Sequence, residues 1–127
     1  MKILVVHRQK STVAVIQSVL SKGQTVARYT ESGLDGLLTS RIEHFDLIIC
    51  GTDLPVITGF ELVRSIRTNS VNRSTPVIFV AETISNKVDQ LAKALGVKGT
   101  ILEERIADEL PAFLPVVGDV FVPSATI

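Results

Sequence analysis

The sequence predicts an α/β protein: a doubly wound, five-stranded parallel sheet with strand order 2-1-3-4-5, sandwiched in three layers between helices. Strand-like and helix-like patterns alternate five times within about 115 residues, which is typical of a parallel sheet with right-handed crossovers. Three of the strand-like runs are almost continuously apolar, as expected for strands buried on both faces. The length of 127 residues, with 46% apolar and 20% charged residues, suits one compact domain. The order 2-1-3-4-5 is one of the common doubly wound orders.

Five segments are predicted as strands because they are short, rich in β-branched residues and bounded by turn or helix-start residues. They are KILVV at 2–6, TVARYT at 25–30, FDLIIC at 45–50, PVIFV at 76–80 and GTIL at 99–102.

Four apolar stripes at helical spacing lie between these strands, and we interpret all four as core. They comprise Val13, Ile16, Val19 and Leu20; Leu34, Leu37, Leu38 and Ile42; Leu62, Val63 and Ile66; and Val88, Leu91, Ala92 and Leu95. Ser11 is expected to cap the first helix, and Gly23 and Gly96 are expected helix stops.

The last helical segment is interrupted by Pro111 and Pro115. Proline inside a helix costs about 3 kcal/mol, so we expect a short helix near residues 106–110 and irregular chain after it. The domain is expected to span residues 1–115. The apolar segment 116–127 is expected to pack on the domain, to form an edge strand or to begin a linker.

Composition excludes several classes of protein. Thirteen basic residues balance thirteen acidic ones, so the chain lacks the charge excess typical of nucleic-acid or membrane-surface binding. The single cysteine, Cys50, excludes an internal disulfide and favours a reducing compartment, which predicts a cytoplasmic protein. No apolar run is long enough for a signal peptide or a membrane span.

Several segments occur in an order and spacing that together are specific. They are ILVV followed by a polar pair, FDLIICGTDLPVITGFELVRSIR, TPVIFVAE and LAKALGVKGTILEE. In these segments the chain resembles the receiver domain of bacterial response regulators over nearly its whole length. The resemblance implies a flavodoxin/CheY-like fold and a signalling module of two-component phosphorelay pathways, not an enzyme.

Receivers of this family take a phosphoryl group onto an aspartate, with Mg²⁺ held by an acidic pair. By this resemblance, the functional positions of the family all carry other residues here. The acidic pair falls on His7 and Arg8, the phosphoacceptor on Gly51, the hydroxyl residue on Ala81, the aromatic switch on Thr100 and the lysine on Glu103.

These replacements remove the expected chemistry. Gly51 offers no carboxylate nucleophile. His7 and Arg8 are not the oxygen ligands that Mg²⁺ requires, and Glu103 places negative charge where a cation would stabilise phosphoryl oxygens. We therefore expect no phosphorylation by the usual route, no metal, no cofactor and no catalytic residue. A substitute acceptor role for Asp53, Thr52 or Thr58 is disfavoured, because an acceptor shifted along the loop points elsewhere.

The charges around this degenerate pocket are inverted relative to the family. One hypothesis is that Arg8 pairs with Asp53 or Glu103 and holds one conformation. The alternative is that these are solvated rim charges, because exposed ion pairs contribute only about 0–1 kcal/mol. A metal site of His7, Asp53 and Glu103 fits no local ligand spacing, and Arg8 opposes a cation.

The first functional hypothesis is a pseudo-receiver that acts through protein contacts without phosphorylation, with a possible homodimer. The resemblance implies contacts on the face between about residues 85 and 114. The candidate interface residues are Val88, Leu91, Phe113, Val116 and Phe121. The alternative for the last three is packing against the domain itself.

The second hypothesis is a small-molecule or nucleotide-binding module on the same fold. It rests on the basic segment HRQKST at 7–12, which leads into a helix start where anions bind well. The segment contains no glycine, so it is neither a dinucleotide fingerprint nor a P-loop.

Overall fold

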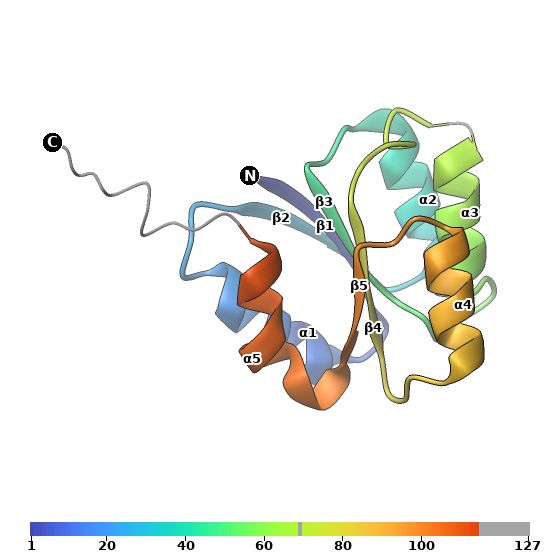
Figure 1. The fold of residues 1–127 in the computed structure, drawn as a ribbon. Coiled ribbons are helices and arrows are strands. Elements are labelled where there is room, and N and C mark those ends of the chain that lie inside the picture. The colour runs from blue at the N-terminus through green and yellow to red at the C-terminus, as the bar shows by residue number, and fades with distance from the viewer. Residues whose placement is uncertain (69, 115–127) are drawn as a thin grey trace, which may run out of the picture.

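The computed structural model describes residues 1–68 and 70–114, and the fold within them is the predicted one (Figure 1). The strands are β1 (Lys2–Val6), β2 (Val26–Thr30), β3 (Leu47–Gly51), β4 (Val77–Ala81) and β5 (Gly99–Leu102). All pair in parallel, in the order β2-β1-β3-β4-β5. The expectations for residues 116–127 lie outside the described residues.

The α-helices are α1 (Lys10–Leu20), α2 (Gly33–Ile42), α3 (Gly59–Thr68), α4 (Asn86–Ala94) and α5 (Ile106–Glu109). Figure 1 shows α1 and α5 on one face of the sheet and α2, α3 and α4 on the other. Within β1, Ile3 and Val5 face the first layer, while Leu4 and Val6 face the second. This alternation gives the molecule two apolar cores, one on each face of the sheet.

Helix α1 begins two residues earlier than a cap at Ser11 would place it. Lys10 is its first residue and Gln9 its N-cap, without a side-chain capping bond. The prediction that Ser11 caps this helix is therefore wrong. Gly96 does end α4: its φ of 68° is left-handed, and the N–H groups of Gly96 and Val97 bond back to the carbonyls of Lys93 and Ala92.

The predicted core stripe of α2 is the main error of the sequence analysis. Leu34, Leu38 and Ile42 are 51%, 53% and 81% exposed. The buried residues of this helix are instead Gly33, Gly36 and Ser40, with Leu37 packed partly against the core. A Cβ at Gly36 would lie 2.8 Å from Val6 Cγ2, so the glycine side of α2 lies close to the sheet and the larger side chains turn outward.

The last part of the described chain is short and irregularly wound, as its prolines suggest. Helix α5 is one turn long and passes into a 3₁₀ turn, Leu110–Phe113, rather than into irregular chain. Phe113 packs against the core, and a Cβ at Gly99 would lie 2.7 Å from its ring. For Phe113 the structure therefore favours packing on the domain over an exposed interface.

Candidate functional site

The candidate site lies at the carboxyl ends of the parallel strands, where doubly wound sheets place their crevices. His7 and Arg8 follow β1, Gly51 ends β3, Ala81 ends β4 and Glu103 follows β5. A crevice of about 220 Å³ lies beside His7, Arg8 and Glu103. It is lined by His7, Arg8, Gln9, Thr52, Asp53, Val80, Glu82, Thr83, Val88 and Glu103.

Not every predicted site residue reaches this crevice. Ala81 is buried, and Thr100 is half-buried within β5, where it pairs with Phe79. Of the interface candidates, Val88 and Leu91 are half-buried on α4, and Val88 also lines the crevice. Val116 and Phe121 lie outside the described residues.

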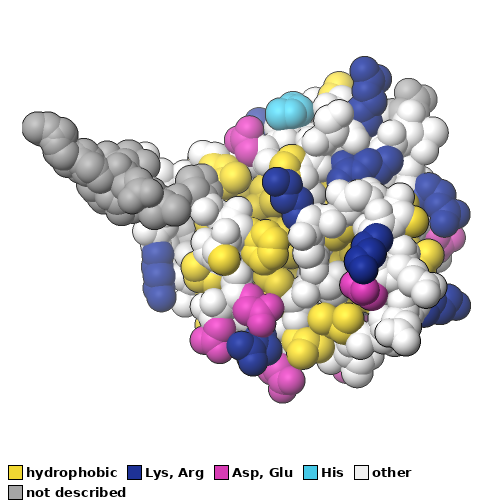
Figure 2. Space-filling model, in the orientation of Figure 1, with side chains coloured by type: hydrophobic (Ala, Val, Ile, Leu, Met, Phe, Trp, Pro, Cys, Tyr) yellow, Lys and Arg dark blue, Asp and Glu magenta, His cyan; other side chains and the backbone are white. Residues whose placement is uncertain are grey.

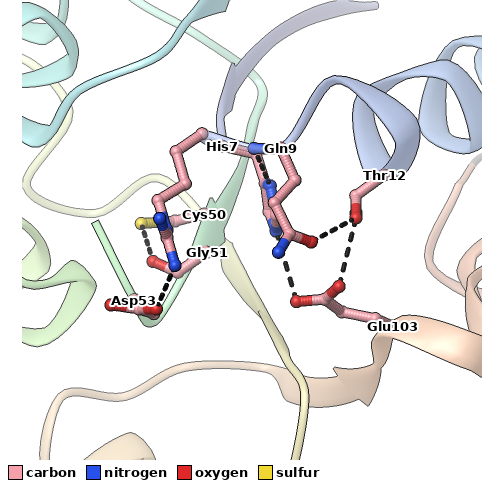
Figure 3. Close-up of polar contacts among 8 residues, drawn as sticks. His7, Gln9, Thr12, Cys50, Gly51, Asp53 and Glu103 are labelled. Atoms are coloured by element: carbon pink, nitrogen blue, oxygen red, sulfur yellow. Dashed lines mark hydrogen bonds and ion pairs between the residues drawn. The ribbon is translucent and has the colours of Figure 1, made fainter. Parts of the chain in front are cut away.

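His7 is the most constrained polar residue of the site. The residue is 4% exposed, and its Nδ1 accepts a hydrogen bond of 3.1 Å from the Gln9 backbone N–H. The other ring nitrogen, Nε2, lies 3.7 Å from Glu103 Oε2 (Figure 3). An acceptor Nδ1 requires the neutral imidazole with its proton on Nε2, directed toward this carboxylate.

Burial is the main reason why the pKa of His7 lies below its ordinary value of 6.5. The Glu103 carboxylate opposes this shift, and the Arg8 guanidinium adds to it. Asp53 makes a smaller opposing contribution. His7 is therefore uncharged at neutral pH, which also fits its acceptor role toward Gln9.

The ring of His7 fills the space next to Gly51. An ideal Cβ at Gly51 would lie 2.8 Å from His7 Cδ2 and 3.3 Å from His7 Nε2. Real Cβ atoms essentially never approach a neighbour within 3.0 Å, so any side chain at position 51 would displace the imidazole. Gly51 and His7 are thus sterically complementary.

Glu103 is held on the opposite side of His7 by Thr12. The Thr12 hydroxyl lies 3.1 Å from Glu103 Oε1 and 3.2 Å from Gln9 Oε1. Figure 3 shows the three side chains and His7 as one connected group. The group joins β1, the start of α1 and the end of β5. Sequence reasoning missed Gln9 and Thr12, which carry no signal beyond lying near a helix start.

Arg8 turns away from this group toward the loop after β3. Its Nη2 lies 2.8 Å from Asp53 Oδ2, so of the two partners considered for Arg8 the structure selects Asp53. The two side chains are 47% and 75% exposed, which limits such a pair to about 0–1 kcal/mol.

The side chains at the crevice do not suit a magnesium ion. Nδ1 of His7 is already an acceptor, and the cation Arg8 is bonded to Asp53. Mg²⁺ requires oxygen ligands in octahedral geometry. Within residues 1–68 and 70–114, no three His, Cys, Asp or Glu side chains gather closely enough to hold a metal ion.

Cys50, next to Gly51 in the sequence, does not supply a nucleophile to the site. It is fully buried, and burial raises the pKa of its thiol to about 12. The thiol donates to the Gly51 carbonyl at 3.3 Å. A protonated, buried thiol is a core residue, not a reactive group.

The loop between β3 and α3 keeps a demanding backbone geometry. A Cβ at Gly59 would lie 2.1 Å from the Gly51 carbonyl oxygen, so the start of α3 touches the end of β3. Val56 has a φ of 71°, and the Ile57 N–H bonds to the Pro55 carbonyl at 2.9 Å around it. This is a γ-turn of the strained kind, on a β-branched residue that is 90% exposed.

Comparisons with known proteins match this chain over most of its length. The family model described as "Response regulator receiver domain" matches residues 3–113. The transcriptional regulatory protein CusR of Escherichia coli is 30% identical over 93 residues. That match covers 72% of this chain but 40% of CusR, so the chain spans well under half the length of this relative.

Two chemotaxis proteins match over more of their length. CheY of Pseudomonas aeruginosa is 28% identical over 113 residues, which cover 87% of this chain and 90% of CheY. The solved structure of CheY4 of Vibrio cholerae superimposes with a TM-score of 0.77 at 26% identity. That alignment covers 89% of this chain and 98% of CheY4. No helix in the described part of this chain is long and apolar enough to cross a membrane.

Proposed function

Because the chain belongs to the response regulator receiver domain family, we propose that it is a pseudo-receiver, a signalling module that acts through protein contacts without being phosphorylated. The observation that carries the proposal is the packing of the His7 ring against Gly51. The position that the family resemblance assigns to the phosphoacceptor has no carboxylate, and the space for one is occupied.

The surrounding charges support the same conclusion. Phosphoryl transfer needs cations around the equatorial oxygens of the phosphoryl group. Here Glu103 faces the crevice with a carboxylate, and the guanidinium of Arg8 is bonded to Asp53. An incoming phosphate would meet the carboxylates of Asp53, Glu82 and Glu103, and a guanidinium already engaged by Asp53, so binding is disfavoured even before the missing nucleophile is considered.

The fold elements around the site are nevertheless kept. The close contact of Gly59 with Gly51 and the γ-turn at Val56 maintain the loop that joins β3 to α3. The loop and helices therefore still present the outer surfaces of a receiver fold, although position 51 has no carboxylate to accept a phosphoryl group. Protein contact is therefore the function that these surfaces support best.

The test is an attempt at phosphorylation. The domain is incubated with acetyl phosphate and Mg²⁺ and, separately, with beryllofluoride and Mg²⁺, with a phosphorylatable receiver treated in parallel. We expect no added phosphoryl mass and no amide shifts at residues 7–12 or 51–58. A stoichiometric phosphoryl adduct, or saturable shifts with beryllofluoride, would contradict the proposal.

A second candidate function, binding of a small anionic molecule, rests on a different observation. A hollow of about 330 Å³ beside α1 is lined by residues that include Arg8, Lys10, Tyr29 and Thr30. Within the described residues, Thr30 Oγ1 is buried without a hydrogen-bond partner. A panel of nucleotides screened by amide NMR tests this function, and saturable shifts at these four residues would favour it over the pseudo-receiver.

A further inference from the structure

The outward face of α2 carries an apolar stripe of three large side chains. Leu34, Leu38 and Ile42 are more than half exposed and lie four residues apart, so they form one ridge along the helix. Val71, which is 59% exposed, lies in the loop before β4. Contiguous exposed apolar surface of this kind marks interaction sites. We call Leu34, Leu38 and Ile42 the α2 ridge.

A basic hollow adjoins the end of this ridge. It has a volume of about 1040 Å³ and lies at the amino ends of β3 and β4, opposite the degenerate pocket. Its lining includes Arg41, Phe45, Asp46, Val71, Arg73 and Thr75. Arg41, next to Ile42 in the sequence, connects the ridge to the hollow.

The charges of the hollow are unbalanced. Arg41 and Arg73 are exposed, and in the described part of the chain neither takes part in an ion pair, whereas six other pairs are formed there. Asp46 is the one carboxylate in the lining, and it accepts a hydrogen bond of 2.7 Å from the Lys2 N–H. Figure 2 shows many of the Lys and Arg side chains on the part of the molecule that holds α3 and α4, where fewer acidic side chains are visible, and several acidic side chains near α5.

The walls of the hollow are held rigidly. Asn72 is fully buried; its side chain accepts from the Phe45 N–H at 2.7 Å and donates to the carbonyls of Ser40 and Glu43. Arg67 donates to the carbonyls of Arg73 and Thr75, at 3.1 and 2.6 Å. These bonds fix the loop that carries Arg73, so a partner meets a preformed surface and loses less entropy on binding.

From these observations we infer that the α2 ridge and the basic hollow form one docking surface for an amphipathic helix of a partner protein. The partner helix places apolar side chains against the ridge and acidic side chains over the hollow. A ridge of residues four apart fits the groove of a facing helix, and helix-in-groove contacts use this spacing. Acidic side chains at one end of the partner helix complement Arg41 and Arg73, which form no ion pair within the described residues.

The size of the surface sets the kind of contact. From Leu34 to Ile42 the ridge is about 12 Å long at 1.5 Å per residue, which matches two to three turns of a partner helix. Stable complexes bury about 800 Å² per partner. Three side chains and the rim of the hollow provide less, so the contact is reversible. The inference deepens the proposed function, on which it rests only in assuming that the domain acts through protein contacts.

The experiment is site-specific photo-crosslinking of the full chain in its native cell. A benzophenone amino acid replaces Leu38 on the ridge, and in a matched control it replaces Val15, which is 39% exposed on α1. We expect an adduct from position 38 and not from position 15, mapped by mass spectrometry to an acidic helical segment of another protein. Arg73→Glu should lower the adduct yield at least about fivefold, because reversing a rim charge disfavours an acidic partner. Lys22→Glu, an equal charge change in an exposed turn, should leave it unchanged.

Each other result overturns the inference. Equal adducts at both positions, or none, would remove the ridge as a docking surface. An adduct between two copies of this chain would assign the ridge to a homodimer, and a yield unaffected by Arg73→Glu would remove the acidic partner. If the domain is phosphorylated in the earlier test while the position-38 adduct persists, the pseudo-receiver proposal fails and the docking surface stands.

Discussion

At position 51, any side chain larger than hydrogen competes with the His7 imidazole for the same volume. We predict that Gly51→Ala lowers the free energy of unfolding by about 1–3 kcal/mol, the usual cost of overpacking. In a His7→Ala background the same change should cost much less, because the ring is no longer there. Urea unfolding of the four proteins in this cycle measures the coupling. Equal costs in both backgrounds would show that the contact does not matter to stability.

The protonation of His7 predicts a pH dependence of stability. The pKa of His7 lies below 6.5 in the folded state and close to 6.5 in the unfolded state. At a pH between the two pKa values, the unfolded chain therefore binds more protons at this residue than the folded chain. The free energy of unfolding should therefore fall as the pH drops from about 7 to about 5.5.

His7→Gln is the control, because it removes the titrating group. It should flatten the urea-unfolding difference between these two pH values. The hydrogen bond with Lys2 lowers the pKa of Glu43 below its ordinary value of 4.5. Protonation of Glu43 also lowers the free energy of unfolding as the pH falls, but it does so below the interval from about pH 7 to about pH 5.5. An unchanged slope in His7→Gln would assign the pH dependence to other groups.

The contents of the site could be predicted only in part. The residue types at positions 7, 8, 51, 53 and 103 are read directly from the sequence, and the resemblance to receivers predicts that they do not support phosphorylation. The position of the His7 ring does not, because it depends on the Gln9 N–H and on the space beside Gly51, neither of which a linear pattern describes. The same holds for Asn72, which stands in a polar loop without any motif.

Among the elements, the loop between α3 and β4 depends on one buried amide. Replacing Asn72 with Ala leaves the Phe45 N–H and the carbonyls of Ser40 and Glu43 without their partner. A buried polar group left without a partner costs about 1–3 kcal/mol. Because water can reach some of these three groups, we predict that the free energy of unfolding falls by about 2–4 kcal/mol in total. The urea midpoint measures it, with Asn86→Ala at the start of α4 as the control. A loss no larger than that of the control would contradict the prediction.

Element types and their order followed from the sequence because strand and helix periods are clear in it. The facing of α2 did not. Its leucines and its glycines both repeat at helical spacing, and apolarity alone favours the leucines as the buried side. The short distance between Gly36 and Val6 decides the matter, and such a distance is a property of the assembled layers.

The whole molecule is built around a central part that is far better buried than its edges. All residues of β3 and β4 and four of the five in β1 are buried, whereas β2 is mostly exposed and β5 has one buried residue. Opening of the sheet should therefore begin at its edges.

Hydrogen exchange monitored by NMR tests this order. We predict that amides of β1, β3 and β4 exchange at the rate set by global unfolding, and that those of β2 and β5 exchange faster through local opening. Uniform protection across all five strands would show that the sheet opens only as a unit.

The complementary shapes of His7 and Gly51 also constrain how this chain can change over generations. A carboxylate placed at position 51 alone collides with the imidazole, and a smaller residue at position 7 alone leaves a gap beside Gly51. Each single substitution is penalised, although both together need not be. Any stepwise path that places a carboxylate at position 51 must therefore pass through a less stable intermediate sequence.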